Sequence, residues 1–352
     1  MNLQYNVYAL LRLPGQPIEA FGGNQQNQSM EAPRAAEKEH FLYAPFREGG
    51  APYYSIPDSL NPNDVFDAVD QIEKALSGSR KQFETKESDY VAGAEKLMEQ
   101  LRNQLLRKVV LSRVKTKPTP VFFKATKFFD LLCETYPNAA VHLFAIEGEE
   151  IWIGASPERL VEIKDSQLKT VSLAGTRKLN SQSAESLEWG AKEKEEQEMV
   201  TEYISEVLDL HKEISGVEQS GPDTITAGNV AHLATQFRAV IPADFDWLRM
   251  VKQLHPTPAI CGVPRDQALA VIKQIEKHER LYYGGFLGKS QKIRASLYLN
   301  LRCLRMVKNE LQLFVGGGYT ASSSIEAEWA ETEHKSETLL SVIEKLRNFE
   351  SL

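Results

Sequence analysis

The chain has 352 residues, of which 42% are hydrophobic and 25% charged. This composition is typical of a soluble globular protein with one large domain or two, and it excludes disordered and fibrous classes. A formal net charge of −7 argues against a nucleic-acid partner, because phosphate binding needs a basic surface.

The three cysteines, Cys133, Cys261 and Cys303, are odd in number and widely spaced, with no CxxC pair. This pattern favours neither a disulfide framework nor a zinc cluster, and it fits a reducing compartment. No stretch is long and apolar enough to span a membrane, and the first residues lack the basic start of a secretion signal. We therefore expect a cytoplasmic protein without a membrane partner.

Residues 1–89 are the least readable part of the chain and are interpreted as a variable N-terminal part of the same domain. Two polar segments, at 22–29 and 53–64, are typical of loops. The pattern sharpens from Tyr90 onward, so the catalytic core is predicted over residues 90–352.

The core predicts strands separated by a few long helices. Short turns join many of the strands, which favours antiparallel pairing and an α+β fold with two largely antiparallel sheets flanked by helices. Strands are predicted at 107–114, 141–147, 151–154, 159–163, 168–173, 293–306 and 310–316, and helices at 91–106, at 187–212 and from Ser323 through Leu346, where Ser323 and Glu326 form a capping box.

The last predicted strand ends in Gly316, Gly317 and Gly318, and Glu328, Glu331 and Lys335 follow on the helix after it. Glycines let backbone N–H groups approach a ligand, and helical spacing places the three charges on one face. That face continues the apolar stripe of the helix, which indicates a small-anion site with a divalent metal. The alternative is a solvated pair of Glu331 and Lys335.

Glu196 similarly precedes the apolar stripe of the long helix at 187–212. It could be a residue at the rim of that stripe. Together with Glu328 and Glu331 it offers carboxylate oxygens from two helices, which suits Mg²⁺.

Lys108 shares a strand face with Val110, Ser112 and Val114, and Glu158 lies at a tight turn between two strands. A lysine on an apolar strand face is a candidate general base. The alternative is an edge-strand lysine that prevents aggregation.

Other candidates are weaker by themselves. Gly175 and Thr176 end a strand and can present backbone donors, although an ordinary turn has the same pattern; His232 and His255 have motif-like surroundings but are more often structural. Arg302, on the strand face of Tyr298 and Asn300, could pair with a carboxylate, and Tyr283 could approach it from the side.

Eight ordered motifs carry a resemblance to a known family. They are KVVLSR at 108–113, ASPERL at 155–160, SLAGT at 172–176, KEKEEQEMV at 192–200, HLAT at 232–235, HPTPAICGVPR at 255–265, YYGGFLG at 282–288 and EWAETEHK at 328–335. Over roughly residues 90–345 the chain resembles the chorismate-utilising enzymes, which comprise isochorismate synthases, salicylate synthases and the large components of anthranilate and aminodeoxychorismate synthases.

The resemblance implies the fold of anthranilate synthase component I and a Mg²⁺-dependent site for chorismate. Glu196 and Glu331 would bind the metal, with Glu328 close behind, and the metal would hold the ring carboxylate of chorismate. The enolpyruvyl carboxylate would be held by Arg302, Tyr283, Lys335 and the amides of Gly316, Gly317 and Gly318, and the ring would be lined by Gly175, Thr176 and His232.

Lys108 matches the lysine that activates water for attack at C2, and Glu158 matches the acid that protonates the departing C4 hydroxyl. The chain departs from the family at Gln197, where a histidine is frequent, and this changes a residue next to the predicted metal ligand Glu196.

The nucleophile is predicted to be water. Ala174 stands where aminodeoxychorismate synthases place an attacking lysine, and residues 1–89 show no tryptophan-binding region of the kind found in anthranilate synthases. The favoured activity is isochorismate synthase, in a menaquinone or siderophore pathway, acting as a monomer or weak dimer on chorismate alone. Salicylate synthase, anthranilate synthase component I and a catalytically silent binding protein remain alternatives.

Overall fold

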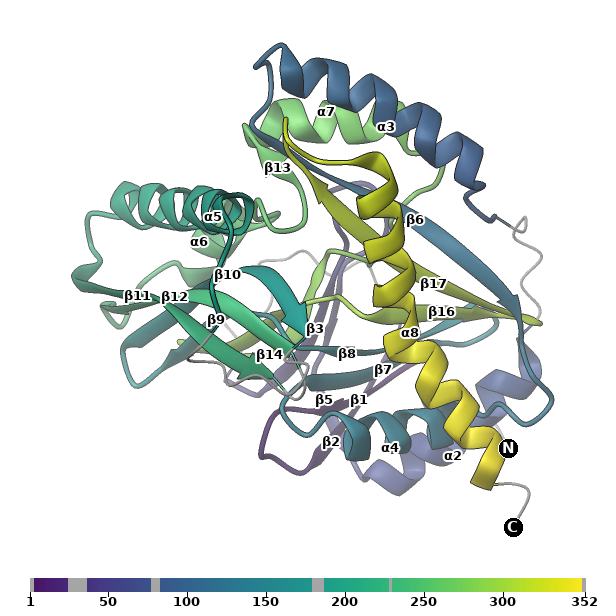
Figure 1. Cartoon of the computed structure of the whole chain (residues 1–352). Helices are drawn as coiled ribbons and strands as arrows, with labels where there is room; N and C mark the ends of the chain where they lie inside the picture. The colour runs from purple at the N-terminus through teal and green to yellow at the C-terminus, as the bar shows by residue number, and fades with distance from the viewer. Residues whose placement is uncertain (1–2, 25–36, 77–82, 179–186, 228–229, 350–352) are drawn as a thin grey trace.

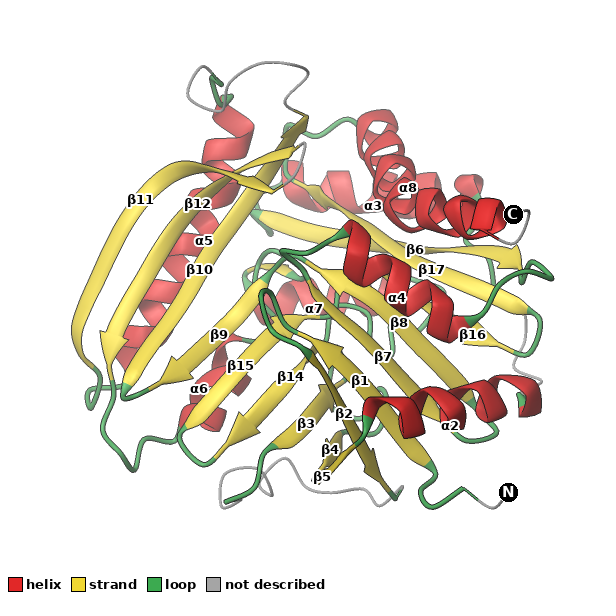
Figure 2. Ribbon diagram, turned by 90° about the horizontal axis from the view of Figure 1, so that it is seen from below, coloured by secondary structure: helices red, strands yellow, loops and turns green. Residues whose placement is uncertain are grey.

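The structure, a computed structural model, describes residues 3–24, 37–76, 83–178, 187–227 and 230–349. Two antiparallel sheets pack face to face, and helices cover their other faces (Figures 1 and 2). This confirms the predicted α+β class. Within the described residues no helix has the length and apolar character needed to cross a membrane.

The first sheet has the strand order β13 (Gly262–Val263), β6 (Lys108–Pro118), β17 (Glu310–Tyr319), β16 (Cys303–Val307), β8 (Glu150–Ser156), β7 (Ala140–Ile146), β1 (Val7–Arg12), β2 (Ile18–Gly23) and β5 (Asp58–Leu60). The second sheet has the order β11 (Ser215–Ala227), β12 (Val230–Val240), β10 (Gln167–Lys178), β9 (Arg159–Lys164), β15 (Arg294–Leu299), β14 (Phe286–Gln291), β3 (His40–Ala44) and β4 (Tyr54–Ile56).

The helices are α2 (Pro62–Ala75), α3 (Glu87–Arg102), α4 (Ala125–Thr135), α5 (Ala191–Leu210), α6 (Trp247–Leu254), α7 (Arg265–Ile275) and α8 (Ile325–Phe349). Side chains of α2, α4 and α8 form one core with the first sheet, and side chains of α3, α5, α6 and α7 form another that includes strands of the second sheet.

A third core, rich in aromatic rings, lies between the two sheets. Strand β7 shows why its sequence reads as a continuous apolar run. Val141 and Leu143 face the helices, whereas Ala140 and Phe144 face the second sheet. A strand buried on both faces needs apolar residues at every position.

The N-terminal part belongs to both sheets, because β1, β2 and β5 extend the first sheet and β3 and β4 end the second. The predicted loop at 53–64 is therefore wrong over β4, β5 and the start of α2. Its apolar positions are too few for a clear period. Most of the loop predicted at 22–29 lies outside the described residues, and the division at residue 89 stays a prediction.

The single strand predicted at 293–306 is also wrong, because the chain changes sheets within it. β15 belongs to the second sheet and β16 to the first, and Arg302 between them has a left-handed φ of 48°. The helix cap lies one residue later than predicted. Ser324 Oγ accepts from the Ala327 amide, and Ser323 instead bonds to Thr320 and Glu328.

The chain also changes sheets at Pro157 and Glu158, between β8 and β9. The two crossings lie side by side. The Leu299 amide donates to the Glu158 carbonyl at 3.0 Å, and the Ala155 amide donates to the Arg302 carbonyl at 3.1 Å. The side chains of Glu158 and Arg302 are thereby fixed where the sheets meet.

Candidate active site

A cavity of about 230 Å³ lies at these crossings, among β6, β17, β10, α5 and α8. Most of the predicted site residues line it. These are Lys108, Glu158, Gly175, Glu196, His232, Tyr283, Arg302, Gly316, Gly318, Glu331 and Lys335. Gly317 and Glu328 lie together directly behind the wall, and the side chain of Thr176 lies outside the described part.

Lys108 begins β6, with β13 on one side of the strand and β17 on the other. The edge-strand alternative is therefore excluded. The lysine is 3% exposed, and its Nζ lies 3.5 Å from Glu196 Oε2. A buried amine that opens onto a polar cavity is placed to accept a proton from a bound water once it is in its neutral form.

Glu158 reaches the same cavity from the crossing between β8 and β9. Burial raises the pKa of its carboxyl group to about 7, although the cations of Lys108, Lys335 and Arg302 act in the opposite direction. The group therefore holds a proton at a higher pH than an ordinary glutamate does. A carboxyl group with such a pKa suits a general acid.

The three glycines of β17 make room for side chains on both faces of the strand. A Cβ on Gly316 would lie 2.9 Å from the Tyr283 hydroxyl, and one on Gly317 would lie 2.8 Å from Glu328 Oε2. A Cβ on Gly318 would lie 3.2 Å from Lys108 Cε. β16 pairs with β17 only as far as Phe314, so the glycine stretch borders the cavity on that side.

The carboxylates that are predicted to bind the metal form ion pairs with lysines in this structure. Lys192 Nζ lies 2.5 Å from Glu328 Oε1 and 3.7 Å from Glu196 Oε1, and Lys335 Nζ lies 2.6 Å from Glu331 Oε1. Over the described ranges no three His, Cys, Asp or Glu side chains are grouped closely enough to hold a metal ion.

The chemistry of these residues nevertheless fits Mg²⁺. Glu196 and Glu328 approach one ammonium, so both are oriented toward a single cation. Glu328 is 1% exposed, its Oε2 atom has no hydrogen-bond partner, and burial raises its pKa against the effect of Lys192. A buried carboxylate oxygen without a donor is suited to a hard cation, which takes oxygen ligands and keeps waters.

Glu331 is the most exposed of the three carboxylates, at 45% of its side chain. Burial alone would raise the pKa of Glu331, but Lys335, Lys192 and Arg302 outweigh that effect and hold the pKa below its usual range. Glu331 is therefore ionised, as a metal ligand has to be.

Arg302, Lys335 and Tyr283 present donors to the cavity. Arg302 Nη1 donates to the Lys335 carbonyl and to Thr338 Oγ1, each at 3.3 Å, and Lys335 Nζ donates to the Gly316 carbonyl at 2.8 Å. These contacts hold the arginine and the lysine close together, and two neighbouring cations suit a carboxylate ligand.

His232 and Gly175 form another part of the wall. Gly175 has φ of 67° at an irregularity of β10, and its carbonyl lies 3.0 Å from His232 Nδ1. Because a carbonyl can only accept, Nδ1 carries the proton and Nε2 is an acceptor. Burial lowers the pKa of His232 despite this hydrogen bond, which keeps the ring neutral. His255, by contrast, bonds to the Gly284 carbonyl and does not line the cavity.

Gln197, the departure from the family pattern, turns away from the cavity into the protein. Its side-chain amide lies 2.8 Å from Ser172 Oγ, 2.9 Å from Thr201 Oγ1 and 2.5 Å from Thr235 Oγ1. The residue is 4% exposed. It therefore ties α5 to β10 and β12 behind Glu196.

Two further features were not singled out in the sequence. The sequence analysis assigns no role to Lys192, although its i,i+4 spacing to Glu196 indicates an ion pair. Arg280 and Glu276 form a buried pair at 2.6 Å, and Arg280 also donates to the carbonyls of Val110 and Ile260, which line the cavity. Nothing local in HisGluArg at 278–280 signals that burial.

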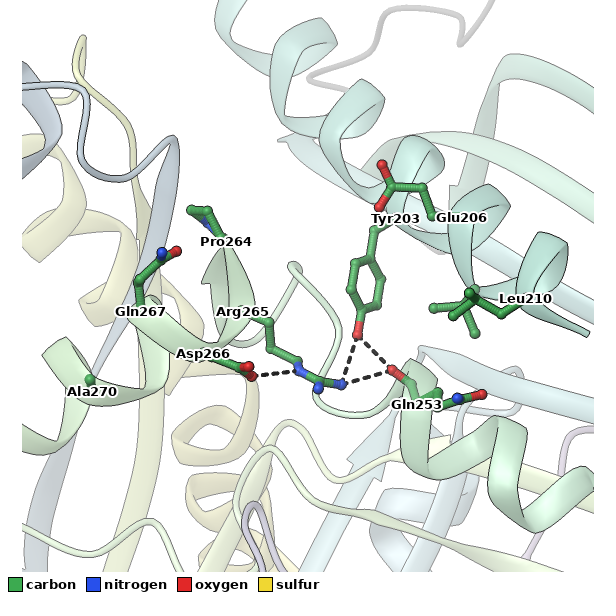
Figure 3. Close-up of a pocket in the computed structure, with 10 residues that line it drawn as sticks. Tyr203, Glu206, Leu210, Gln253, Pro264, Arg265, Asp266, Gln267 and Ala270 are labelled. Carbon is green, nitrogen blue, oxygen red and sulfur yellow. Dashed lines mark hydrogen bonds and ion pairs between the residues drawn. The ribbon is translucent and has the colours of Figure 1, made fainter.

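A larger depression, of about 690 Å³, lies elsewhere, among α5, α6 and the start of α7 (Figure 3). Its lining is mostly apolar, and Arg265 crosses it to donate to the Tyr203 hydroxyl at 3.2 Å and to the Gln253 carbonyl at 3.0 Å. None of the predicted site residues lines this depression, so size alone does not identify the active site.

Comparison with known proteins identifies the family of the chain. A family model described as chorismate binding enzyme matches residues 62–344, and the chain belongs to this family. It is 30% identical over 242 residues to isochorismate synthase EntC of Escherichia coli (strain K12), covering 67% of this chain and 62% of that protein. It is 31% identical over 266 residues to the salicylate biosynthesis isochorismate synthase of Pseudomonas aeruginosa, covering 73% of this chain and 54% of that protein. The chain thus spans less than two thirds of the length of these relatives.

Solved structures share the fold. The menaquinone-specific isochorismate synthase MenF from Escherichia coli matches with a TM-score of 0.79 and 23% identity over 96% of this chain and 89% of that one. Anthranilate synthase component I from Streptococcus pneumoniae TIGR4 matches with a TM-score of 0.72 and 14% identity over 96% of this chain and 93% of that one. The predicted fold of anthranilate synthase component I is therefore confirmed.

Proposed function

We propose that the protein is an isochorismate synthase, which converts chorismate to isochorismate with Mg²⁺ by adding water at C2 and releasing the C4 hydroxyl. The observation that carries the proposal is that Lys108 and Glu158 line one cavity, and that the pKa of Glu158 is near 7. A base and an acid on either side of one ring are what this exchange of hydroxyl groups needs.

In the proposed reaction Lys108, in its neutral form, takes a proton from a water molecule while the oxygen of that water forms a bond to C2. The ring double bonds shift, the bond from C4 to its hydroxyl breaks, and Glu158 gives its proton to the departing oxygen. One water is consumed and one is released, so the step is an isomerisation that needs no oxidant or reductant.

The remaining residues hold the substrate. Arg302 and Lys335 are assigned to the enolpyruvyl carboxylate, with the Tyr283 hydroxyl and the backbone of Gly316–Gly318 beside them. His232 is assigned to the ring side, where neutral Nε2 can accept a hydrogen bond from a hydroxyl group. Glu196, Glu331 and Glu328 are assigned to the metal, which when bound supplies positive charge for the ring carboxylate.

Water is favoured as the nucleophile because Ala174 lines the cavity where an attacking lysine would otherwise lie. A salicylate synthase would share the same first step and then eliminate pyruvate. A silent binding protein is disfavoured, because Lys108, Glu158 and the three carboxylates are all present. Cytoplasmic residence fits the three free cysteines, and action as a monomer or weak dimer belongs to the same proposal.

The test is to incubate the purified protein with chorismate, with Mg²⁺ or with a chelator, and to separate the products by chromatography. Isochorismate formed only with Mg²⁺ supports the proposal. Salicylate with equimolar pyruvate would move the assignment to a salicylate synthase, and anthranilate formed with ammonium would make ammonia the nucleophile. If chorismate is not consumed at all, the proposed enzymatic function is wrong, and the protein would be a catalytically silent binding protein.

A further inference from the structure

A second cavity, of about 340 Å³, adjoins the candidate active site. Residues of β9, β10 and β12 form most of its wall, and the loops at Pro14 and Asn138 face them. Four residues, Pro157, Glu158, Leu173 and His232, line both cavities. A ligand in the second cavity would therefore lie against Glu158 and His232 from the side away from Lys108.

The second cavity is lined by three cations. Lys169 and Arg238 face each other across β10 and β12, both are exposed, and neither has an ion pair within the described residues. Like charges opposite one another on neighbouring strands are destabilising. An anion bound between them would offset that repulsion.

Two acids flank this pair of cations in the sheet, but neither lines the cavity. Glu162 is the register neighbour of Lys169 but is held by the third cation, Arg159, at 2.8 Å. Glu218 is the register neighbour of Arg238 on β11 and does not line the cavity. Glu158 is the one carboxyl group among the described lining residues.

The rest of the wall suits a ring. Val171, Leu173, Ile225 and Tyr298 contribute apolar and aromatic surface. A pocket with an apolar wall and a few charged groups is the usual composition of a small-molecule site. The combination fits a small cyclic molecule that carries carboxylates.

We propose that the second cavity is a capture site for small cyclic carboxylates, where the dianionic substrate is held before it passes Glu158 and His232 into the active site. This inference rests on the proposed function for the identity of the substrate. The chain has a net charge of −7 and would repel a dianion at long range. A cleft lined with one sign of charge concentrates the field locally and raises the rate of association.

The test uses the double variant Lys169→Gln/Arg238→Gln, with Lys164→Gln/Arg294→Gln as the control. The control removes the same two charges from exposed positions of the same sheet, and neither of its residues lines either cavity. The association rate constant of chorismate is measured by stopped-flow tryptophan fluorescence at increasing salt. Trp189 lies against Gly175, which lines the active-site cavity, and is the expected reporter.

At low ionic strength the double variant is expected to bind chorismate about tenfold more slowly, toward the lower end of the range for electrostatic steering. The difference should shrink as salt screens the charges, whereas the control should follow the wild type. Turnover at saturating chorismate should change less than about twofold, because the steering acts on association.

Equal association rate constants for the double variant and the wild type would overturn the proposal. If the double variant also kept the wild-type association rate but was inhibited more weakly by 2-hydroxybenzoate, the cavity would hold an aromatic carboxylate as a regulator and not the incoming substrate. That result would also overturn the proposal. If the wild type binds chorismate but forms no isochorismate, the proposed function fails, and the comparison of association rates still decides whether the cavity captures the ligand.

Discussion

Burial raises the pKa of the Glu158 carboxyl group to about neutral pH, and this couples its protonation to the stability of the fold. Its pKa rises from 4.5 to about 7. A folded-state pKa above the unfolded value gives a stabilising contribution that is complete below the unfolded pKa. That contribution is lost as the pH rises through about 7. The cations of Lys108, Lys335 and Arg302 face the group and keep the shift from being larger.

The first prediction concerns Glu158→Gln, which cannot ionise. Relative to the wild type, the variant should become more stable as the pH rises from about 5 to about 8.5, by an amount on the order of 3 kcal/mol. The measurement is the thermal unfolding midpoint of both proteins at several pH values, without substrate.

Glu147→Gln, at an exposed position in the turn between β7 and β8, is the matched control and should show no such trend. A constant difference between Glu158→Gln and the wild type across the range would mean that the carboxyl group titrates normally.

The second prediction concerns Lys108→Ala. The variant should still bind chorismate and Mg²⁺ but should turn over about 10²- to 10⁴-fold more slowly, since that is the usual contribution of a general base. Steady-state rates and a binding titration check this. Lys117→Ala, at an exposed position on the same strand, should behave as the wild type. A loss of less than about tenfold would assign the base to another group.

The third prediction concerns Lys192→Met. Without added Mg²⁺ the variant should unfold at a lower temperature, because buried Glu328 loses the ammonium 2.5 Å away. The loss should be smaller than the roughly 3–5 kcal/mol of a fully buried pair, because Lys192 is 35% exposed. Added Mg²⁺ should raise its unfolding midpoint more than that of the wild type, and calorimetry should give tighter Mg²⁺ binding.

Lys194→Met, at an exposed position on the same helix, is the control for this comparison. A Lys192→Met protein that responds to Mg²⁺ as the wild type does would show that the ammonium and the metal do not share Glu328 and Glu196.

At the scale of elements, Gln197 fixes the helix that carries Glu196. The fourth prediction is that Gln197→Ala destabilises the protein by about 1–3 kcal/mol, because the buried hydroxyl group of Thr235 loses its partner and that of Ser172 keeps only Thr201. Activity at a temperature well below unfolding should fall less than in Lys108→Ala. Denaturant unfolding measures the first effect, with Glu198→Ala, exposed on the same helix, as the control. Unchanged stability would mean that the hydroxyls find other partners.

The elements that could be predicted are those with a clear period or a clear boundary. α3, α5 and α8, together with β6 to β10, were found because their apolar residues recur at helical spacing or form short runs bounded by turns. The crossing between β15 and β16 was not predicted because Arg302 has a left-handed backbone conformation there. In a sequence, a glycine is the usual sign of that conformation.

The candidate site was predictable mainly through its ordered motifs. Spacing alone could place Glu328, Glu331 and Lys335 on one helix face, but it could not bring them to Lys108 or Glu158. That requires the pairing of β6 with β17 and the crossing at Pro157, which are contacts between distant parts of the chain. The ion pair between Lys192 and Glu328 was not predicted because it depends on the position of α8 relative to α5.

At the scale of the whole molecule, the cavity lies beside two of the places where the chain crosses between the sheets, β8 to β9 and β15 to β16, and each of these crossings contributes a side chain to it. Backbone hydrogen bonds between the crossings hold Glu158 and Arg302 in fixed relation. The reacting groups are thus held by the part of the fold that joins the two sheets, and not by free loops.

The most direct measurement of the central claim is the fate of oxygen when the protein converts chorismate in water enriched in ¹⁸O with Mg²⁺ present. The account predicts isochorismate that carries one heavy oxygen, at the C2 hydroxyl, at the earliest times that mass spectrometry can sample. Isochorismate without the label would mean that the C4 oxygen is transferred within the molecule, and would contradict the roles given to Lys108 and Glu158.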